Sequence, residues 1–410
     1  MPERKRIYLC LAKMSEAGWE QKYIQEAFDT HWVAPLGANV NGFEEDLKLF
    51  MGGEHEVVSL ASGTAAIHIA LLLCGVGPGD EVLVQSFTFC ASAHPVTYLG
   101  AKPVFIDSEP YTWNMDPDLL EEAIRDRLAK TGRLPKAIVP VTLYGMPYQI
   151  DRIMAVATRY GIPVVEDTAE SLGSRYDGRM MGTFGQFGVL SFNGNKMITT
   201  SGGGALICAD PAMKQKALWY ATQARESYPY YQHEAIGYNY RLSNICAGIG
   251  RGQMKVVNDH IAHHRKVQAL YEELLAGVPG VSVHGNPELP GQAGQDGKRF
   301  DSNFWLCTMT LDPSVRVKGQ EQAYAGMQRT ACEPNVNVEA LRAYLDQAGI
   351  EVRPLWKPMH KQPVYLDAPA YLNGVSESLF KVGLCLPAGP CVSEDDVRYI
   401  VDKIQQAIVA

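Results

Sequence analysis

The sequence predicts an α/β protein, with a large domain built on a mostly parallel sheet and a smaller C-terminal α+β domain. Apolar runs rich in β-branched residues alternate with helical patterns, which is typical of βαβ units. The 410 residues are 46% apolar and 20% charged, which is enough for two domains with substantial cores. A Gly/Pro-rich polar stretch begins near residue 285, and a more mixed pattern of strands and helices follows it.

The large domain is expected to contain five clear strands separated by helices. The strands are "EVLVQSF" (81–87), "KPVFIDS" (102–108), "KAIVPVTLYG" (136–145), "IPVVEDTA" (162–169) and "GVLSFN" (188–193). The helices are "TAAIHIALLLCGV" (64–76), "CASAHPVTYLG" (90–100), "DPDLLEEAIRDRLAK" (116–130) and "QIDRIMAVATRYG" (149–161). One long helix is expected over 245–278.

The smaller domain is expected to hold two strands and two helices after the Gly/Pro-rich loop. "FWLCTMTLD" (304–312) and "IEVRPLW" (350–356) have the strand pattern, and "NVEALRAYLDQAG" (337–349) and "EDDVRYIVDKIQQAI" (394–408) the helical one. We place the domains at 1–265 and 266–410.

Composition excludes several classes of protein. The net charge of -8 and the absence of a long basic run argue against a nucleic-acid binder. No apolar run approaches the ~18 residues of a membrane span, and the apolar patch near the start is shorter than a secretory signal requires. The nine cysteines are scattered, so we expect reduced thiols in a cytoplasmic protein.

Two polar groups stand at predicted strand ends or helix starts, where ligands of a doubly wound sheet collect. Ser62, Gly63 and Thr64 precede an apolar helix, and their bare N–H groups would suit a phosphate. Ser-Gly-Thr is also a routine helix N-cap. Asp167 directly follows a buried strand, where a carboxylate needs a cation or a hydrogen-bond donor. A structural salt bridge is the alternative there.

An aromatic residue and a lysine are the other candidate site residues. Phe89 ends a strand and could lie over a flat ring, or belong to the core. Lys196 is the single lysine of "FGVLSFNGNKMITTSGGGALI", which contains no carboxylate. Because an amine attacks an aldehyde only when neutral, a surrounding poor in carboxylates is what an imine-forming lysine requires.

Together these groups suggest one cofactor, pyridoxal 5'-phosphate. A pyridine ring with a phosphate arm needs an amine for a Schiff base, an acid to keep its ring nitrogen protonated, an anion cradle and a stacking face. The sequence has neither a G-x-x-x-x-G-K-[ST] motif nor a G-x-G-x-x-G motif after a strand, so the common nucleotide-binding loops are not expected.

The chain also resembles the DegT/DnrJ/EryC1/StrS sugar aminotransferases. The resemblance rests on "ASGTAAIHIAL", "GAKPVFID", "VVEDTAESLGS", "GTFGQFGVLSFNGNKMITTSGGGALI" and "GYNYRLSNICAGIGRGQM", in this order between about residues 20 and 260. It implies the fold-type-I architecture of PLP-dependent aminotransferases with a seven-stranded sheet. It also implies a cytoplasmic homodimer whose active sites are shared between subunits, and L-glutamate as the amino donor.

The resemblance assigns roles to matching positions. Lys196 matches the Schiff-base lysine, and Asp167 the acid facing the pyridine nitrogen. Thr64 and Ser191 match residues that bind the cofactor phosphate, and Ser62 and Gly63 lie in the same turn as Thr64.

Four further positions follow from the same match. Phe89 takes the place of the aromatic that stacks on the ring, and Asn239 that of a polar residue reaching the phosphate from the partner subunit. Glu170 stands where many members have Gln or His, and Asn193 where some have His. These two departures put the tuning of the cofactor in question.

A narrower resemblance concerns the substrate. "VAPLGANVNGFE", "ATQARE", "RPLWKPMH" and "AYLNGVSE" resemble the bacillosamine-pathway members, which aminate C4 of a UDP-linked 4-keto-6-deoxy-N-acetylhexosamine. The implied substrate-binding residues are Ala34, Pro35, Leu36, Gly37, Arg353, Trp356, Lys357 and His360. For Arg353, Trp356 and His360 the alternative is that a strand end simply packs on the large domain.

Other interpretations remain open. His260, His263 and His264 could suggest a metal, but no third ligand or catalytic glutamate accompanies the i, i+4 pair, so a solvated helix face is expected and no metal. Cys385 and Cys391 are expected to be buried thiols. Three alternative functions remain: amination at C3 or with the opposite C4 stereochemistry on another nucleotide-linked keto sugar, a PLP-binding regulator without turnover, and a sugar-nucleotide-binding module without PLP. The last of these would leave Lys196 and Asp167 without roles.

Overall fold

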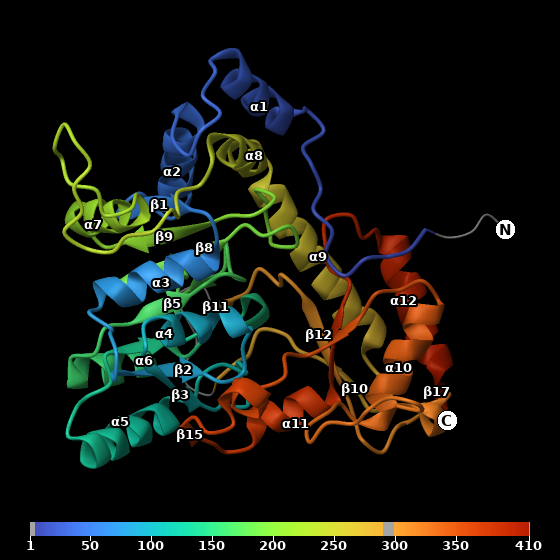
Figure 1. Cartoon of the computed structure of the whole chain (residues 1–410). Helices are drawn as coiled ribbons and strands as arrows, with labels where there is room; N and C mark the ends of the chain where they lie inside the picture. The colour runs from blue at the N-terminus through green and yellow to red at the C-terminus, as the bar shows by residue number, and fades with distance from the viewer. Residues whose placement is uncertain (1–4, 290–298, 410) are drawn as a thin grey trace.

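The computed structural model describes residues 5–289 and 299–409 (Figure 1). The middle of the predicted Gly/Pro-rich loop lies outside the described residues. The larger part of the chain, blue to green in Figure 1, is a sheet covered by helices, and the smaller part, orange to red, lies beside it.

A seven-stranded sheet forms the larger part. Its order is β1-β9-β8-β5-β4-β2-β3, in which bridges Ile138–Val164 and Val141–Asp167 join β4 to β5. The strands are β1 Glu56–Leu60, β2 Glu81–Gln85, β3 Lys102–Ile106, β4 Ala137–Val139, β5 Val165–Asp167, β8 Phe187–Ser191 and β9 Gly204–Cys208. β9 is antiparallel to both of its neighbours and the other pairs are parallel. The predicted mostly parallel sheet is confirmed.

Two strands of this sheet are absent from the sequence prediction. β1 and β9 are not among the five predicted strands, although a helix follows each of them, and they pair with each other across a long chain separation. A short strand from the other end of the chain, β15 (Ala370–Tyr371), lies parallel to β3 and extends the sheet.

Helices cover both faces of the sheet, and the strands alternate accordingly. In β2, Val82 and Val84 belong to the core under α3 (Gly63–Leu73) and α7 (Pro211–Ala221), whereas Leu83 belongs to the core under α5 (Pro117–Thr131) and α6 (Ile150–Tyr160). Because successive side chains of a strand point to opposite faces, a strand buried on both sides reads as a continuous apolar run. Three further helices of the larger part are α1 Trp19–Asp29, α2 Ala38–Phe50 and α4 His94–Tyr98.

The expected long helix over 245–278 is two helices, α8 (Asn244–Met254) and α9 (Val257–Leu275). No proline or glycine marks the break at 255–256. The last turn of α8 tightens, with the Lys255 and Val256 N–H groups donating to the carbonyls three residues earlier. Beside this turn the buried Gln253 amide donates to the Lys13 carbonyl at 3.0 Å and to Glu20 at 2.7 Å. The sequence pattern alone could not show this.

The smaller part contains an antiparallel sheet in the order β10-β12-β16-β14. Its strands are β10 Val281–Val283, β12 Cys307–Leu311, β14 Arg353–Pro354 and β16 Gly383–Leu386, and its helices are α10 Val336–Gln347, α11 Val375–Val382 and α12 Glu394–Ala407. Five short strands lie outside the two main sheets: β6 Arg175–Tyr176, β7 Arg179–Met180, β11 Phe300–Asp301, β13 Arg316–Val317 and β17 Ile408–Val409.

Two segments lie across the predicted boundary between residues 265 and 266. Near the N-terminus Ile7 pairs with Ile350 and is buried in the core of the smaller part, whereas β15 joins the large sheet. The division therefore stays a prediction. Among the described residues, no helix is long and apolar enough to cross a membrane.

Candidate active site

A cavity of about 360 Å³ lies where the parallel strands end and α3 begins. Its walls come from the loops after β2, β4, β5 and β8, and from the segments that carry Trp305 and Trp356. It brings together ten of the predicted residues: Ser62, Gly63, Thr64, Phe89, Asp167, Glu170, Ser191, Asn193, Lys196 and Trp356.

The N-terminus of α3 forms one end of this cavity. The Ser62 hydroxyl accepts from the Ala65 N–H at 3.0 Å and so caps the helix. A Cβ on Gly63 would lie 3.2 Å from the Ser191 Cβ, and one on Gly204 would lie 2.4 Å from the Gly63 nitrogen. The two glycines thus allow β8, β9 and the helix start to pack closely. A helix N-terminus of this kind favours an anion.

Asp167 ends β5 and is only 5% exposed. The Ser92 hydroxyl donates to its Oδ2 at 2.6 Å, and the Ala169 N–H donates to its Oδ1 at 3.2 Å. Burial raises the pKa of Asp167, against the lowering effect of the Ser92 hydrogen bond and of the Lys196 charge. A cation placed against this carboxylate would stabilise its charged form.

Lys196 lies in the β8–β9 connection, and its side chain is 13% exposed. Its Nζ is 3.5 Å from Glu170 Oε1, so the carboxylate that its own sequence segment lacks is supplied by another loop. Glu170 comes from the neighbouring β5 strand end, which a sequence window around Lys196 does not include. Burial raises the pKa of Glu170, with the Lys196 charge opposing this rise.

Aromatic rings form much of the remaining wall. Phe89 is 50% exposed, so it is not a core residue, and its ring centroid is 5.4 Å from that of Trp356. Trp305 is 1% exposed, and its ring centroid lies 3.8 Å from Lys196 Nζ. Trp305 is not among the predicted site residues, because it stands in an apolar strand-like run more than a hundred residues beyond the lysine.

Three of the predicted substrate residues do not line this cavity as far as the structure describes it. Arg353 is on the surface and pairs with Glu351 at 2.9 Å. His360 is 9% exposed, and its Nδ1 lies 2.7 Å from the Ser86 hydroxyl. Lys357 is also absent from the lining. Of this group, only Trp356 reaches the cavity.

The other predicted substrate segment lies at a separate cavity. Pro35, Leu36 and Asn239 line a hollow of about 680 Å³ together with Arg225 and other residues. The Ala34 carbonyl accepts from the N–H of Asn244, and Gly37 precedes α2. This chain therefore does not present these residues to its own Lys196 cavity.

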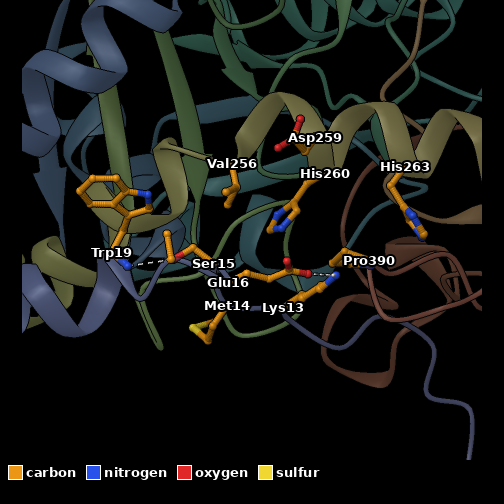
Figure 2. Close-up of a pocket in the computed structure, with 11 residues that line it drawn as sticks. Lys13, Met14, Ser15, Glu16, Trp19, Val256, Asp259, His260, His263 and Pro390 are labelled. Atoms are coloured by element: carbon orange, nitrogen blue, oxygen red, sulfur yellow. Dashed lines mark hydrogen bonds and ion pairs between the residues drawn. The ribbon is translucent and has the colours of Figure 1, made fainter.

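A third cavity, of about 460 Å³, contains none of the predicted cofactor residues. Figure 2 shows His260 and His263 pointing from α9 toward the segment that carries Lys13 and Glu16. The expected solvated histidine face is wrong, because His260 is 7% exposed and His264 is fully buried. Their ring nitrogens lie near the Met197 and Phe304 carbonyls, at 3.3 and 3.1 Å.

No group of three metal-ligating side chains occurs within residues 5–289 and 299–409. The nine cysteines are free thiols. Cys385 is buried as expected, but Cys391 is exposed, because it lies in the turn before α12 rather than in β16.

The arrangement of residues in the Lys196 cavity agrees with the protein family that the sequence matches. Residues 15–405 match the model of the DegT/DnrJ/EryC1/StrS aminotransferase family. The chain belongs to this family. It is therefore an aminotransferase, and its cofactor is pyridoxal phosphate.

Two relatives and one solved structure illustrate the similarity. The chain is 45% identical over 404 residues to the putative PLP-dependent aminotransferase EpsN of Bacillus subtilis, covering 98% of this chain and 95% of the relative. It is 34% identical over 409 residues to the GDP-perosamine synthase of Caulobacter vibrioides, covering 100% of both. A DegT/DnrJ/EryC1/StrS aminotransferase structure from Brucella abortus superposes with a TM-score of 0.82 at 30% identity, over 95% of each chain. The fold-type-I architecture is confirmed.

Proposed function

We propose that this aminotransferase moves an amino group from L-glutamate to C4 of UDP-2-acetamido-2,6-dideoxy-α-D-xylo-hexos-4-ulose, giving UDP-2-acetamido-4-amino-2,4,6-trideoxyglucose. The observation that carries the reaction type is the single cavity in which Lys196 faces Glu170, with Asp167 and the start of α3 on the other walls. The choice of sugar rests on the narrower sequence resemblance and on Trp356, which lines the cavity.

The residues present fit pyridoxal phosphate. The close-packed start of α3, made possible by Gly63, would hold the phosphate. Asp167, buried with only hydroxyl and N–H donors bonded to it, would hold a protonated ring nitrogen, and Phe89 would cover a ring face. When bound, the cofactor supplies an aldehyde that receives the amino group and a ring that takes up electrons from the donor's α-carbon.

Lys196 is the group placed to move protons in this cavity. Its Nζ is held beside Glu170 and is largely shielded from water. When free, this amine would take a proton from the donor's α-carbon, and in the second half-reaction it would deliver one to C4 of the sugar. No other lysine lines the described part of the cavity.

We further propose that two subunits share each active site. Pro35, Leu36 and Asn239 lie together at a hollow outside their own chain's Lys196 cavity, which is the arrangement needed if they complete the site of a partner. Arg225 is exposed at the same hollow and would supply positive charge for a diphosphate. Arg353, Lys357 and His360 stay predictions as substrate residues.

Complementation tests the shared site. Lys196→Ala and Asn239→Ala chains are each expected to be inactive, and mixing them under exchange should restore activity. In a heterodimer both lesions fall in one site and the other site is intact, so an equal mixture should reach about one quarter of wild-type activity. A fully active Asn239→Ala protein, or an active monomer in size-exclusion chromatography, would contradict this arrangement.

A substrate panel tests the sugar. With glutamate as donor, we expect turnover of the UDP-linked 4-keto sugar in preference to 3-keto, dTDP-linked and GDP-linked sugars, and an equatorial C4 amine by NMR. The similarity to a GDP-perosamine synthase makes a GDP-linked substrate the main competitor. An axial amine, or exclusive use of a 3-keto, dTDP- or GDP-linked sugar, would refute the substrate but not the reaction type. Bound cofactor without any turnover would favour a regulator.

A further inference from the structure

Trp305 provides a fixed aromatic face under the Lys196 amine. The ring centroid is 3.8 Å from Lys196 Nζ, well inside the ~6 Å range of a cation–π contact. The indole is 1% exposed, and its Nε1–H donates to the Asn195 carbonyl at 2.6 Å. The ring therefore cannot turn away from the lysine without losing this hydrogen bond.

The Lys196 amine contacts one carboxylate and one aromatic ring. Glu170 Oε1 contacts the amine at 3.5 Å, and the lysine charge also reaches Asp167 and Cys10. Burial raises the pKa of Cys10 to about 12, so that thiol is uncharged. The Lys196 side chain is only 13% exposed, so a charge on its amine has little water around it, and the ring face replaces part of that solvation.

We propose that Trp305 is a positioning residue, which holds the Lys196 side chain whenever this lysine is not bonded to the cofactor and stabilises it once its amine carries a proton. The inference rests on the proposed role of Lys196. In each turnover an amine substrate must replace the lysine, and the freed lysine must stay close enough to move protons. A site that stabilises the freed ammonium makes that replacement more favourable.

Displacement by methylamine measures this effect without turnover. Methylamine replaces Lys196 on the same cofactor carbon, and Lys196 gains the proton that methylammonium loses, so no oxidant or water is consumed. Borohydride then fixes whichever amine is attached, and the mass of the intact protein gives the fraction still bonded to Lys196. For Trp305→Leu, the methylamine concentration that displaces half of the lysine should rise about tenfold, because the freed ammonium loses its aromatic contact.

Two variants and one ligand distinguish a positioning role of Trp305 from a general disruption of the cavity. Trp305→Phe keeps a ring face and should stay within about threefold of wild type, since Phe is also a cation–π partner. Trp19→Leu is the matched control, because Lys22 Nζ lies 5.2 Å from that ring and outside the Lys196 cavity. It should not change the displacement. The affinity for pyridoxamine phosphate, which cannot bond to lysine, should be unchanged in all variants if the cavity is intact.

The Glu170 contribution is separated by a double-mutant cycle. Glu170→Gln and Trp305→Leu, alone and combined, show whether the ring acts independently of the carboxylate. The proposal is overturned if the methylamine concentration that displaces half of Lys196 is the same in Trp305→Leu as in wild type, or if it rises as much in Trp305→Phe as in Trp305→Leu. It is also overturned if the affinity of Trp305→Leu for pyridoxamine phosphate falls to the same extent. If borohydride attaches no cofactor to wild type, the proposed role of Lys196 is wrong, and this failure differs from that of the Trp305 proposal. Comparison of wild type with Lys196→Ala tests it.

Discussion

Lys196→Ala is expected to abolish turnover, with a loss of about 10,000-fold or more, the upper end of what one positioned acid–base group contributes. The variant removes the amine that lies between Glu170 and Trp305, and no other lysine lines the described cavity to replace it. The yellow absorbance of lysine-attached pyridoxal phosphate should also disappear, and borohydride should add no cofactor mass to the protein.

Lys13→Ala is the matched control, because Lys13 lines the separate cavity of Figure 2. It should retain both the absorbance and the activity. The assignment of Lys196 would be wrong if its alanine variant kept the absorbance in the absence of added amine, or if it still turned over.

Asp167→Asn is expected to lower kcat by about 100- to 1,000-fold, as the loss of one preorganised electrostatic partner does in other enzymes. The carboxylate is buried and is bonded only to donors among the described residues, so a positive ring nitrogen would be its natural partner. An amide of the same size keeps the shape of the site but cannot hold that charge. Steady-state kinetics at saturating donor and sugar would measure the loss.

Two comparisons keep this result interpretable. Ser92→Ala removes the hydroxyl that donates to Asp167 Oδ2 and leaves the carboxylate, so its effect should be clearly smaller. The melting temperature of cofactor-free Asp167→Asn should not fall, because the substitution also removes a buried carboxylate whose pKa is raised by burial. A rate within a few-fold of wild type would rule out the proposed role.

Much of the larger part could be predicted because its strands are buried on both faces and separated by helices. Runs such as 81–87 and 102–108 became β2 and β3 with little change. The strands at one edge of the sheet were harder to predict. β1 and β9 pair with each other across a long chain separation, and no local pattern reports such a pairing.

The catalytic candidates were also readable from local chemistry. Small residues at a helix start, an aspartate after a buried strand and a lysine among apolar and small residues are unusual in themselves, and the structure brings them to one cavity. The substrate group was less predictable. Arg353 and His360 are close to Trp356 in sequence, but only Trp356 points to the cavity, because a short strand followed by a 3-10 turn sends successive side chains to different surroundings.

The sequence by itself determined the α/β class, the family and ten of the residues that line the Lys196 cavity, because those features depend on residue type and on order along the chain. Only the tertiary structure decided what surrounds Lys196. Glu170 and Trp305 come from other loops, and their distances of 3.5 and 3.8 Å from the amine depend on how those loops pack. The contacts beside the break between α8 and α9 are of the same kind, since the Gln253 side chain bonds to distant segments. Contacts between residues far apart in the chain leave no periodic signal in the sequence, so they become visible only when the chain is folded.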